Sequence, residues 1–191
     1  MWTVGQIPMV TATLNEVWGS SASDVYAVGT TGTIVRWNGS AWAKQTNPAT
    51  DALNSVHGAG GSVYAVGMAG TILKTTNQGT TWTKLTSNST ATLYSVFATS
   101  ASDVWTVGGT STLLHSTDGG QSWTKLTFTD ASSLYSVWAA ASTVYVGTST
   151  GIYRSTDGGR TWKRILHVDE RTGASGTRHV GLRRSTRTRP I

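Results

Sequence analysis

Two short stretches, STDGGQSW at 116–123 and STDGGRTW at 155–162, place an aspartate between hydroxyl side chains and a pair of glycines. A carboxylate in this setting could belong to the pair of acids that a glycosidase needs on either side of the scissile bond. It could also be an oxygen ligand in a calcium loop. A third role is to accept backbone N–H bonds across a turn, for which Asp and Asn are equally suited. The rest of the chain decides among these roles.

The chain repeats with a period of about forty residues. Four segments begin at Leu14, Leu53, Leu93 and Leu134, with spacings of 39, 40 and 41 residues. Each segment contains four short apolar runs separated by Gly, Ser, Thr and Asn, which is the pattern of β-propeller blades. The sequence therefore predicts an all-β, propeller-type fold of four four-stranded blades plus a spare N-terminal edge strand. The predicted parts are an orphan outer strand and linker at 1–13, blades at 14–52, 53–92, 93–133 and 134–168, and a disordered basic tail at 169–191.

The two aspartates fall on the turn between the third and fourth predicted strands of a unit. The second unit has Asn77 at the equivalent position, in TTNQGTTW, and the first has Asn38 in RWNGSAW. Since Asn can accept hydrogen bonds but cannot act as an acid, this position is predicted to serve as a turn acceptor. The predicted structural residues are Asn77, Gly79, Trp82, Asp118, Gly120, Trp123, Asp157, Gly159 and Trp162.

These stretches resemble the Asp-box, or bacterial neuraminidase repeat, of sialidases, xyloglucan-cleaving glycosidases, sortilin-type receptor domains and photosystem II assembly factors. The resemblance covers about 14–166 and implies a propeller with the box at the blade periphery, away from any active site. Enzymes and non-enzymes share the box, so it implies no single function. The stretch VWGSSASDVYAVG is also similar to repeats of large bacterial surface or secreted proteins, which implies a secreted or cell-surface parent.

Catalysis by this chain alone is not expected. Glu16 is the only acid within a predicted strand, whereas glycoside hydrolysis requires two suitably placed carboxylates. A sialidase-like site would also need an early Arg-Ile-Pro motif, but Gln6 stands where that arginine would be. The four histidines lack metal-ligand spacing and the chain has no cysteine, so no metal or cofactor is expected. The sequence therefore favours a non-catalytic propeller module that binds or scaffolds a protein or a carbohydrate and that could be part of a larger or oligomeric propeller. The alternative is a fragment of an Asp-box glycosidase whose site needs further blades.

A large ring ends the first predicted strand of every unit. These rings, with Glu16 two residues before the first of them, are the candidate ligand-binding residues: Trp18, His57, Phe97 and Trp138. The first strand of a blade lines the central channel of a propeller, so the four rings could form an aromatic collar. One interpretation is packing between blades; the other is a platform for a sugar face or an apolar side chain of a protein ligand.

Basic residues also recur at equivalent positions. The third strands carry Arg36, Lys74, His115 and Arg154, and the fourth strands carry Lys44, Lys84, Lys125 and Arg164. We interpret them chiefly as protection of the outer sheet edges against aggregation. An anionic partner is the lesser alternative, and no motif indicates specific nucleic-acid binding.

The ends of the chain differ from the repeat. The net charge is +6, and six arginines lie after position 167. Trp2 precedes Leu14 by almost the spacing that separates each later box tryptophan from the next unit, which indicates that residues 1–5 form a spare outer strand. This strand could pair in a homodimer, which we favour, or the chain could close as a four-bladed monomer with Trp2 packed outside. No apolar run is long enough to span a membrane, and no signal-peptide pattern is visible at the start.

Overall fold

The computed structural model describes residues 10–168, which form four four-stranded antiparallel sheets. We call them blades 1 to 4. Blade 1 contains β1 (Leu14–Ser21), β2 (Asp24–Gly29), β3 (Ile34–Trp37) and β4 (Trp42–Lys44). Blade 2 contains β5 (Leu53–Ala59), β6 (Ser62–Gly67), β7 (Ile72–Thr75) and β8 (Thr83–Leu85). Blade 3 contains β9 (Leu93–Ala98), β10 (Val104–Gly108), β11 (Leu113–Ser116) and β12 (Thr124–Lys125). Blade 4 contains β13 (Leu134–Ala140), β14 (Thr143–Thr148), β15 (Gly151–Ser155) and β16 (Lys163–His167).

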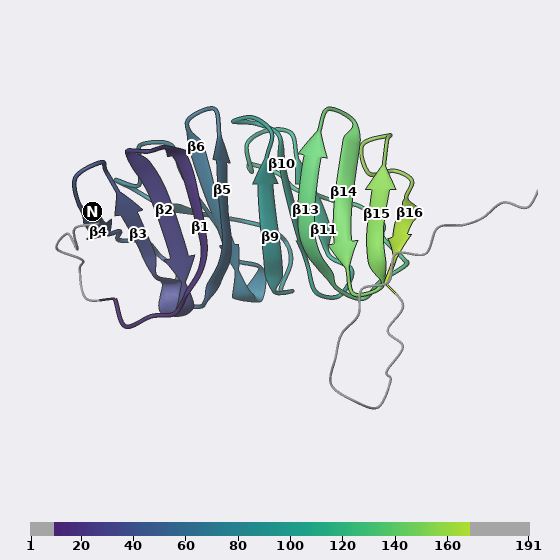
Figure 1. Ribbon diagram of the computed structural model, residues 1–191, viewed down its shortest axis with the longest axis horizontal. Coiled ribbons are helices and arrows are strands. Elements are labelled where there is room, and N and C mark those ends of the chain that lie inside the picture. The colour runs from purple at the N-terminus through teal and green to yellow at the C-terminus, as the bar shows by residue number, and fades with distance from the viewer. Residues whose placement is uncertain (1–9, 169–191) are drawn as a thin grey trace, which may run out of the picture.

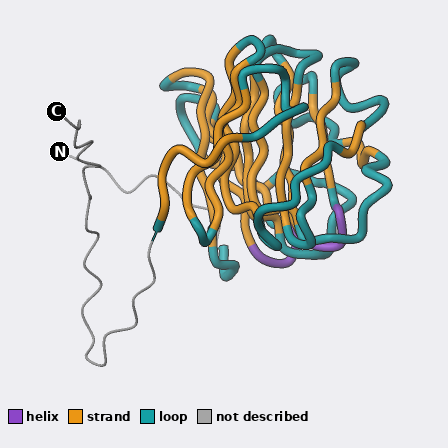
Figure 2. The backbone as a smooth tube through the Cα atoms, turned by 90° about the vertical axis from the view of Figure 1, so that its right-hand side faces the viewer, coloured by secondary structure: helices purple, strands orange, loops and turns teal. Residues whose placement is uncertain are grey.

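Each blade is a meander whose spatial order follows the chain, so its first strand is innermost and its fourth is the outer edge. The first strands β1, β5, β9 and β13 stand side by side in that order (Figure 1). Figure 2 shows the strands from the side, with the two short 3-10 segments, Thr30–Gly32 and Met68–Gly70, at one end of the sheets. The predicted all-β, propeller-type fold of four four-stranded blades is confirmed. The predicted spare strand at 1–5 and the tail at 169–191 lie outside the described residues.

The hydrophobic core consists of three layers, one between each pair of neighbouring blades. Between blades 1 and 2, Val28 and Ile34 pack against Leu53 and Val56. Equivalent clusters join blade 2 to blade 3 and blade 3 to blade 4. The second strands of blades 2 and 3 are buried throughout, because a neighbouring blade covers each of their faces.

Glycines close the second strand where the backbone of the preceding connection comes very near. A Cβ added to Gly29 would lie 2.1 Å from the carbonyl oxygen of Thr13, and Gly67 and Gly108 have equivalent close contacts. Gly147 is different: it pairs with Ile152 inside β14, which continues to Thr148. The fourth unit is therefore shifted by one residue at this point relative to the others.

Candidate functional site

The four rings of the predicted aromatic collar lie in one row along the inner strands. The ring centroids of Trp18 and His57 are 5.5 Å apart, those of His57 and Phe97 4.4 Å, and those of Phe97 and Trp138 6.0 Å. The strands β1, β5, β9 and β13 each contribute one ring. Three rings are half-buried, whereas Trp138 is 48% exposed. The structure thus brings the four predicted residues together as neighbours.

The collar rings also pack between blades. The Trp18 indole lies over Gly58, where an added Cβ would come within 2.6 Å of the ring, and it stacks on Tyr26. The Nδ1 atom of His57 accepts a hydrogen bond from the Ala98 N–H at 3.1 Å. Burial lowers the pKa of His57, because the cation would be desolvated. The rings therefore join adjacent inner strands and keep part of their surface exposed.

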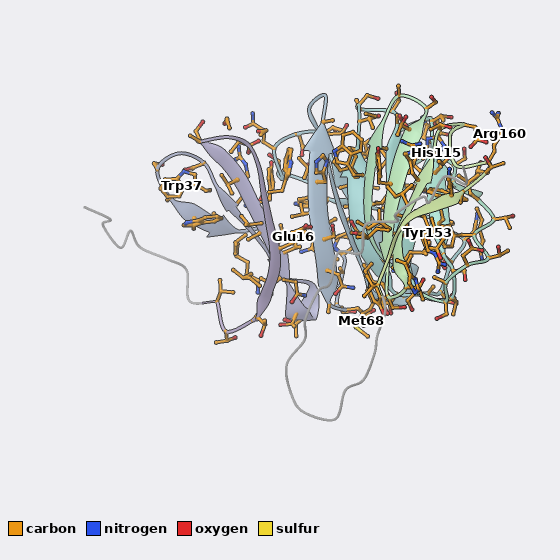
Figure 3. All side chains as sticks on the ribbon, turned by 45° about the vertical axis from the view of Figure 1, so that its right-hand side comes forward. Glu16, Trp37, Met68, His115, Tyr153 and Arg160 are labelled. Carbon is orange, nitrogen blue, oxygen red and sulfur yellow. The ribbon has the colours of Figure 1, made fainter. Side chains whose placement is uncertain are left out.

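Glu16 uses its carboxylate to join two blades. Its Oε2 atom accepts a hydrogen bond from the Val56 N–H at 2.6 Å, and Figure 3 shows it between blades 1 and 2. The hydroxyls of Ser55 and Ser95 make the same connection to the next blade, from the Val96 N–H at 3.0 Å and the Val137 N–H at 3.3 Å. The repeat in the sequence aligns Glu16 with these serines, but it gave no sign of the hydrogen bond that they share. In the structure all three occupy the same place in the repeat.

The two Asp-box aspartates are held by hydrogen bonds inside their turns. Asp118 accepts from the Ser122 hydroxyl at 2.5 Å, from the Ser122 N–H at 2.9 Å and from the Ser116 hydroxyl at 2.8 Å. These bonds, with the Ser122 hydroxyl contributing most, hold the pKa of Asp118 well below its usual range. Asp157 is bonded likewise by Ser155 and Thr161, and its pKa is also lowered well below the usual range.

The same turn forms with an amide in place of the carboxylate. The Oδ1 atom of Asn77 accepts from the Thr81 N–H at 3.0 Å and from the Thr75 hydroxyl at 2.9 Å. The glycine two residues after the Asp or Asn of each of these boxes has a positive φ: Gly79, Gly120 and Gly159, at 78°, 87° and 81°. An L side chain is strained in that conformation, so glycine is suited to these positions.

The box tryptophans pack against the blade that precedes their own. Trp82 is buried and meets Tyr26 of blade 1 edge to face at 6.0 Å. Trp123 packs in the cluster that contains Tyr64, and Trp162 in the cluster that contains Trp105. Each lies immediately before its outer strand, which begins at Thr83, Thr124 or Lys163. The box turn thus reaches the second strand of the neighbouring blade.

Several third-strand basic residues have specific partners instead of guarding an edge. Arg36 pairs with Asp24 at 2.7 Å and donates to Gln78 of the blade 2 box turn at 3.0 Å. Burial alone would raise the pKa of Asp24, but the bonds from Ser20 and Arg36 outweigh it and lower the pKa.

Blades 2 and 3 use the same position differently. The Lys74 ammonium donates to the Gly119 carbonyl at 2.8 Å, above the Tyr64 ring, and His115 contacts Asp103 at 2.6 Å. The interpretation as edge protection is therefore wrong for Arg36, Lys74 and His115, because these side chains point into contacts between strands or blades. The sequence contains a sign of two of these pairs, because Asp24 and Asp103 precede the predicted second strand in the units that carry Arg36 and His115.

Other candidate sites are few within residues 10–168. No group of three or more His, Asp or Glu side chains there could hold a metal ion. No helix in that range is long and apolar enough to cross a membrane. One surface hollow of about 200 Å³ lies at the periphery between Phe128, Asp130, Arg160 and Trp162, and it contains no collar residue.

Comparison with known proteins agrees with this architecture. The BNR/Asp-box repeat family matches residues 114–125 and 153–164. No curated protein sequence matches the chain. Among solved structures, YCF48 bound to D1 peptide is similar with a TM-score of 0.69 and 19% identity, over 87% of this chain and 56% of that one. YCF48 from Cyanidioschyzon merolae gives a TM-score of 0.67 and 17% identity, over 86% and 60% of the two chains.

An enzyme has a similar fold as well. An ancestral GH74 enzyme matches with a TM-score of 0.70 and 20% identity, over 88% of this chain and 26% of the enzyme. The chain thus spans little more than half the length of the YCF48 chains and about a quarter of the GH74 chain. Identities at this level establish a shared fold, and a fold is used by many functions.

Proposed function

We propose that this chain, a protein of β-propeller type with Asp-box repeats, is a non-catalytic module that binds a protein segment at the aromatic collar. The observation that carries the proposal is the unbroken row of four partly exposed rings on four adjacent inner strands. Aromatic rings give large contact areas at low entropic cost, and they accept apolar or aromatic side chains well.

The state of the carboxylates supports a non-catalytic role. Glu16, two residues before the collar residue Trp18, accepts a hydrogen bond from the Val56 N–H with one carboxylate oxygen. Asp118 and Asp157 are engaged in their turns, and Asp24 is paired with Arg36. A glycosidase needs one protonated and one ionised carboxyl group facing each other across the sugar. Lowered pKa values in Asp118, Asp157 and Asp24 are the opposite of what a general acid requires.

A protein ligand is favoured over a carbohydrate by one comparison. The similar YCF48 structure contains a bound peptide, so a fold of this kind can bind a peptide. A carbohydrate remains the second candidate, because the GH74 enzymes have the same fold and sugar faces stack on indoles. A fragment of an Asp-box glycosidase is the corresponding enzymatic alternative, with further blades supplying the missing groups.

The proposal is tested by ligand screening with collar variants. The chain is titrated with a peptide library and an oligosaccharide panel, followed by tryptophan fluorescence and calorimetry. Trp138→Ala should weaken peptide binding by about tenfold, which corresponds to about 1.4 kcal/mol. Trp37→Ala is the matched control, because Trp37 is a partly exposed indole on β3, outside the collar (Figure 3). Binding of peptides that is equally strong in both variants would refute the collar as the site, and binding confined to oligosaccharides would refute a protein ligand.

A further inference from the structure

Blade 4 exposes, on its side away from blade 3, groups that the other blades bury. The residues opposite Val28, Val66 and Val107 in the second strands are fully buried against the next blade; they are Ile34, Ile72 and Leu113. Ile152 holds the same place in blade 4, opposite Gly147, and is 37% exposed. Tyr145 and Arg154 share that side of the sheet, and Arg154 is exposed.

Blade 1 exposes the complementary groups on its opposite side. Leu14 and Val17 of β1 are 46% and 63% exposed. The residues at the same two positions of the other blades are buried against the preceding blade: Leu53, Val56, Leu93, Val96, Leu134 and Val137. The two end faces of the row are thus the two unlike halves of one interface, which recurs three times inside the chain.

Each end face also carries one of the two groups that form the polar contacts of that interface. Within the described residues, a side-chain oxygen accepts a hydrogen bond from a valine N–H of the next blade three times, at Glu16, Ser55 and Ser95. Ser136 is the fourth side chain of this series, and the Val17 N–H is the fourth donor. Arg154 likewise corresponds to Arg36 and Lys74, which bind the box turn of the next blade.

The aromatic contacts follow the same rule. Tyr26 meets the box tryptophan of the following blade edge to face, and Tyr64 and Trp105 lie in the same clusters as the box tryptophans of blades 3 and 4. Tyr145 is the fourth ring of this series, and Trp42 of blade 1 holds the place of a box tryptophan. Apolar, polar and aromatic elements of the end faces therefore match in kind and in order.

We propose that blade 4 of one copy of this chain docks on blade 1 of a second copy, and that two copies close a ring of eight blades. The interface joins unlike faces, and such a heterologous contact forms a closed assembly when its rotation closes. Eight blades lie within the range of about four to eight that closed propellers adopt. In the closed ring Ile152 packs on Leu14 and Val17 of the second copy, Ser136 accepts from its Val17 N–H, and Trp138 becomes neighbour to its Trp18. The inference stands apart from the proposed ligand and needs none.

The test measures mass in solution by light scattering and sedimentation. The unmodified chain should give about twice 20.2 kDa. Ile152→Asp and Val17→Asp each bury an unpaired carboxylate in the interface, so each should weaken dimerisation by more than about 100-fold. Met68→Asp is the control, because Met68 is 46% exposed but lies at the lower edge of the sheets, away from both end faces (Figure 3). Circular dichroism melts establish that every variant is folded.

Mixing the two variants distinguishes this geometry from others. A mixed dimer has one interface with both aspartates and one with neither, so mixing Ile152→Asp with Val17→Asp should recover dimers that neither variant forms alone. A monomeric unmodified chain would overturn the proposal. So would a dimer that survives both substitutions, a mixture that recovers nothing, or a mass well above that of two chains.

Discussion

Removing the Tyr64 hydroxyl isolates one contact between blades 2 and 3. The side chain is fully buried, and its oxygen lies 2.9 Å from the Ala101 carbonyl and 3.2 Å from the Gly119 carbonyl. In Tyr64→Phe the Gly119 carbonyl keeps the Lys74 ammonium, while the Ala101 carbonyl loses its side-chain donor. One lost hydrogen bond with a carbonyl left behind costs about 1–2 kcal/mol of unfolding free energy. For a domain of this size the Tm should fall by about 2–8 °C.

Tyr26→Phe is the matched control, one blade earlier at the same position of the repeat. The Tyr26 hydroxyl is buried, and no partner lies at hydrogen-bonding distance and angle. Burial, followed by the charge of Asp24, raises its pKa to about 12. Removing this hydroxyl should leave the unfolding free energy equal or higher, because no hydrogen bond is lost and a buried polar group without a partner is removed. The measurement is urea unfolding of both variants at pH 7 with equal m-values. Equal losses in the two variants would refute the assignment of the Tyr64 bond.

Three further predictions concern the box, the collar and Glu16. Asp118→Ala should lower the Tm more than Asp118→Asn, because Asn77 forms the same turn bonds; equal losses on thermal unfolding would contradict this. The lowered pKa of His57 implies that the unfolded chain binds its proton more readily, so the unfolding free energy should fall as pH drops below about 6.5 and should level off above it. Urea titrations should show a weaker slope in His57→Phe, and an unchanged slope would exclude His57 as the source. Glu16→Ser should cost less stability than Glu16→Val, since serine carries the same bond in blades 2 and 3; chemical unfolding that ranks them the other way would contradict the shared role.

The fold could be predicted because every unit repeats the same local signals. The leucine spacing, the four apolar runs and the box turn each indicate the same blade, and each blade of the structure has four strands. Collar neighbours were predictable for the same reason: equivalent positions on the first strands must lie side by side once the blades stack. The exposure of Trp138 could not be predicted in this way, because it arises from the position of blade 4 at the end of the row.

What sequence reasoning missed are partners that lie in the next blade. Arg36 meets Gln78 across 42 residues, and Glu16 meets Val56 across 40. Neither sequence separation is that of a turn or of two adjacent strands in one blade, and both are close to one period of the repeat. A residue at position i of one unit therefore has to be read against the same region of the following unit. Within a single unit Glu16 resembles a lone catalytic acid and Arg36 a solvated cation.

The two unlike faces of a blade explain why the repeat could be predicted from the sequence and why the contacts between blades could not. One face offers an apolar residue such as Ile34, a side-chain oxygen on the first strand and a ring on the second. The other receives them with the Leu and Val of the first strand, a backbone N–H and a box tryptophan. The box turn contacts the preceding blade. Its aspartate holds the turn in shape, so this residue at the periphery also stabilises the packing of neighbouring blades. An Asp-box substitution should then act first on cohesion between blades, and only through it on a ligand at the collar.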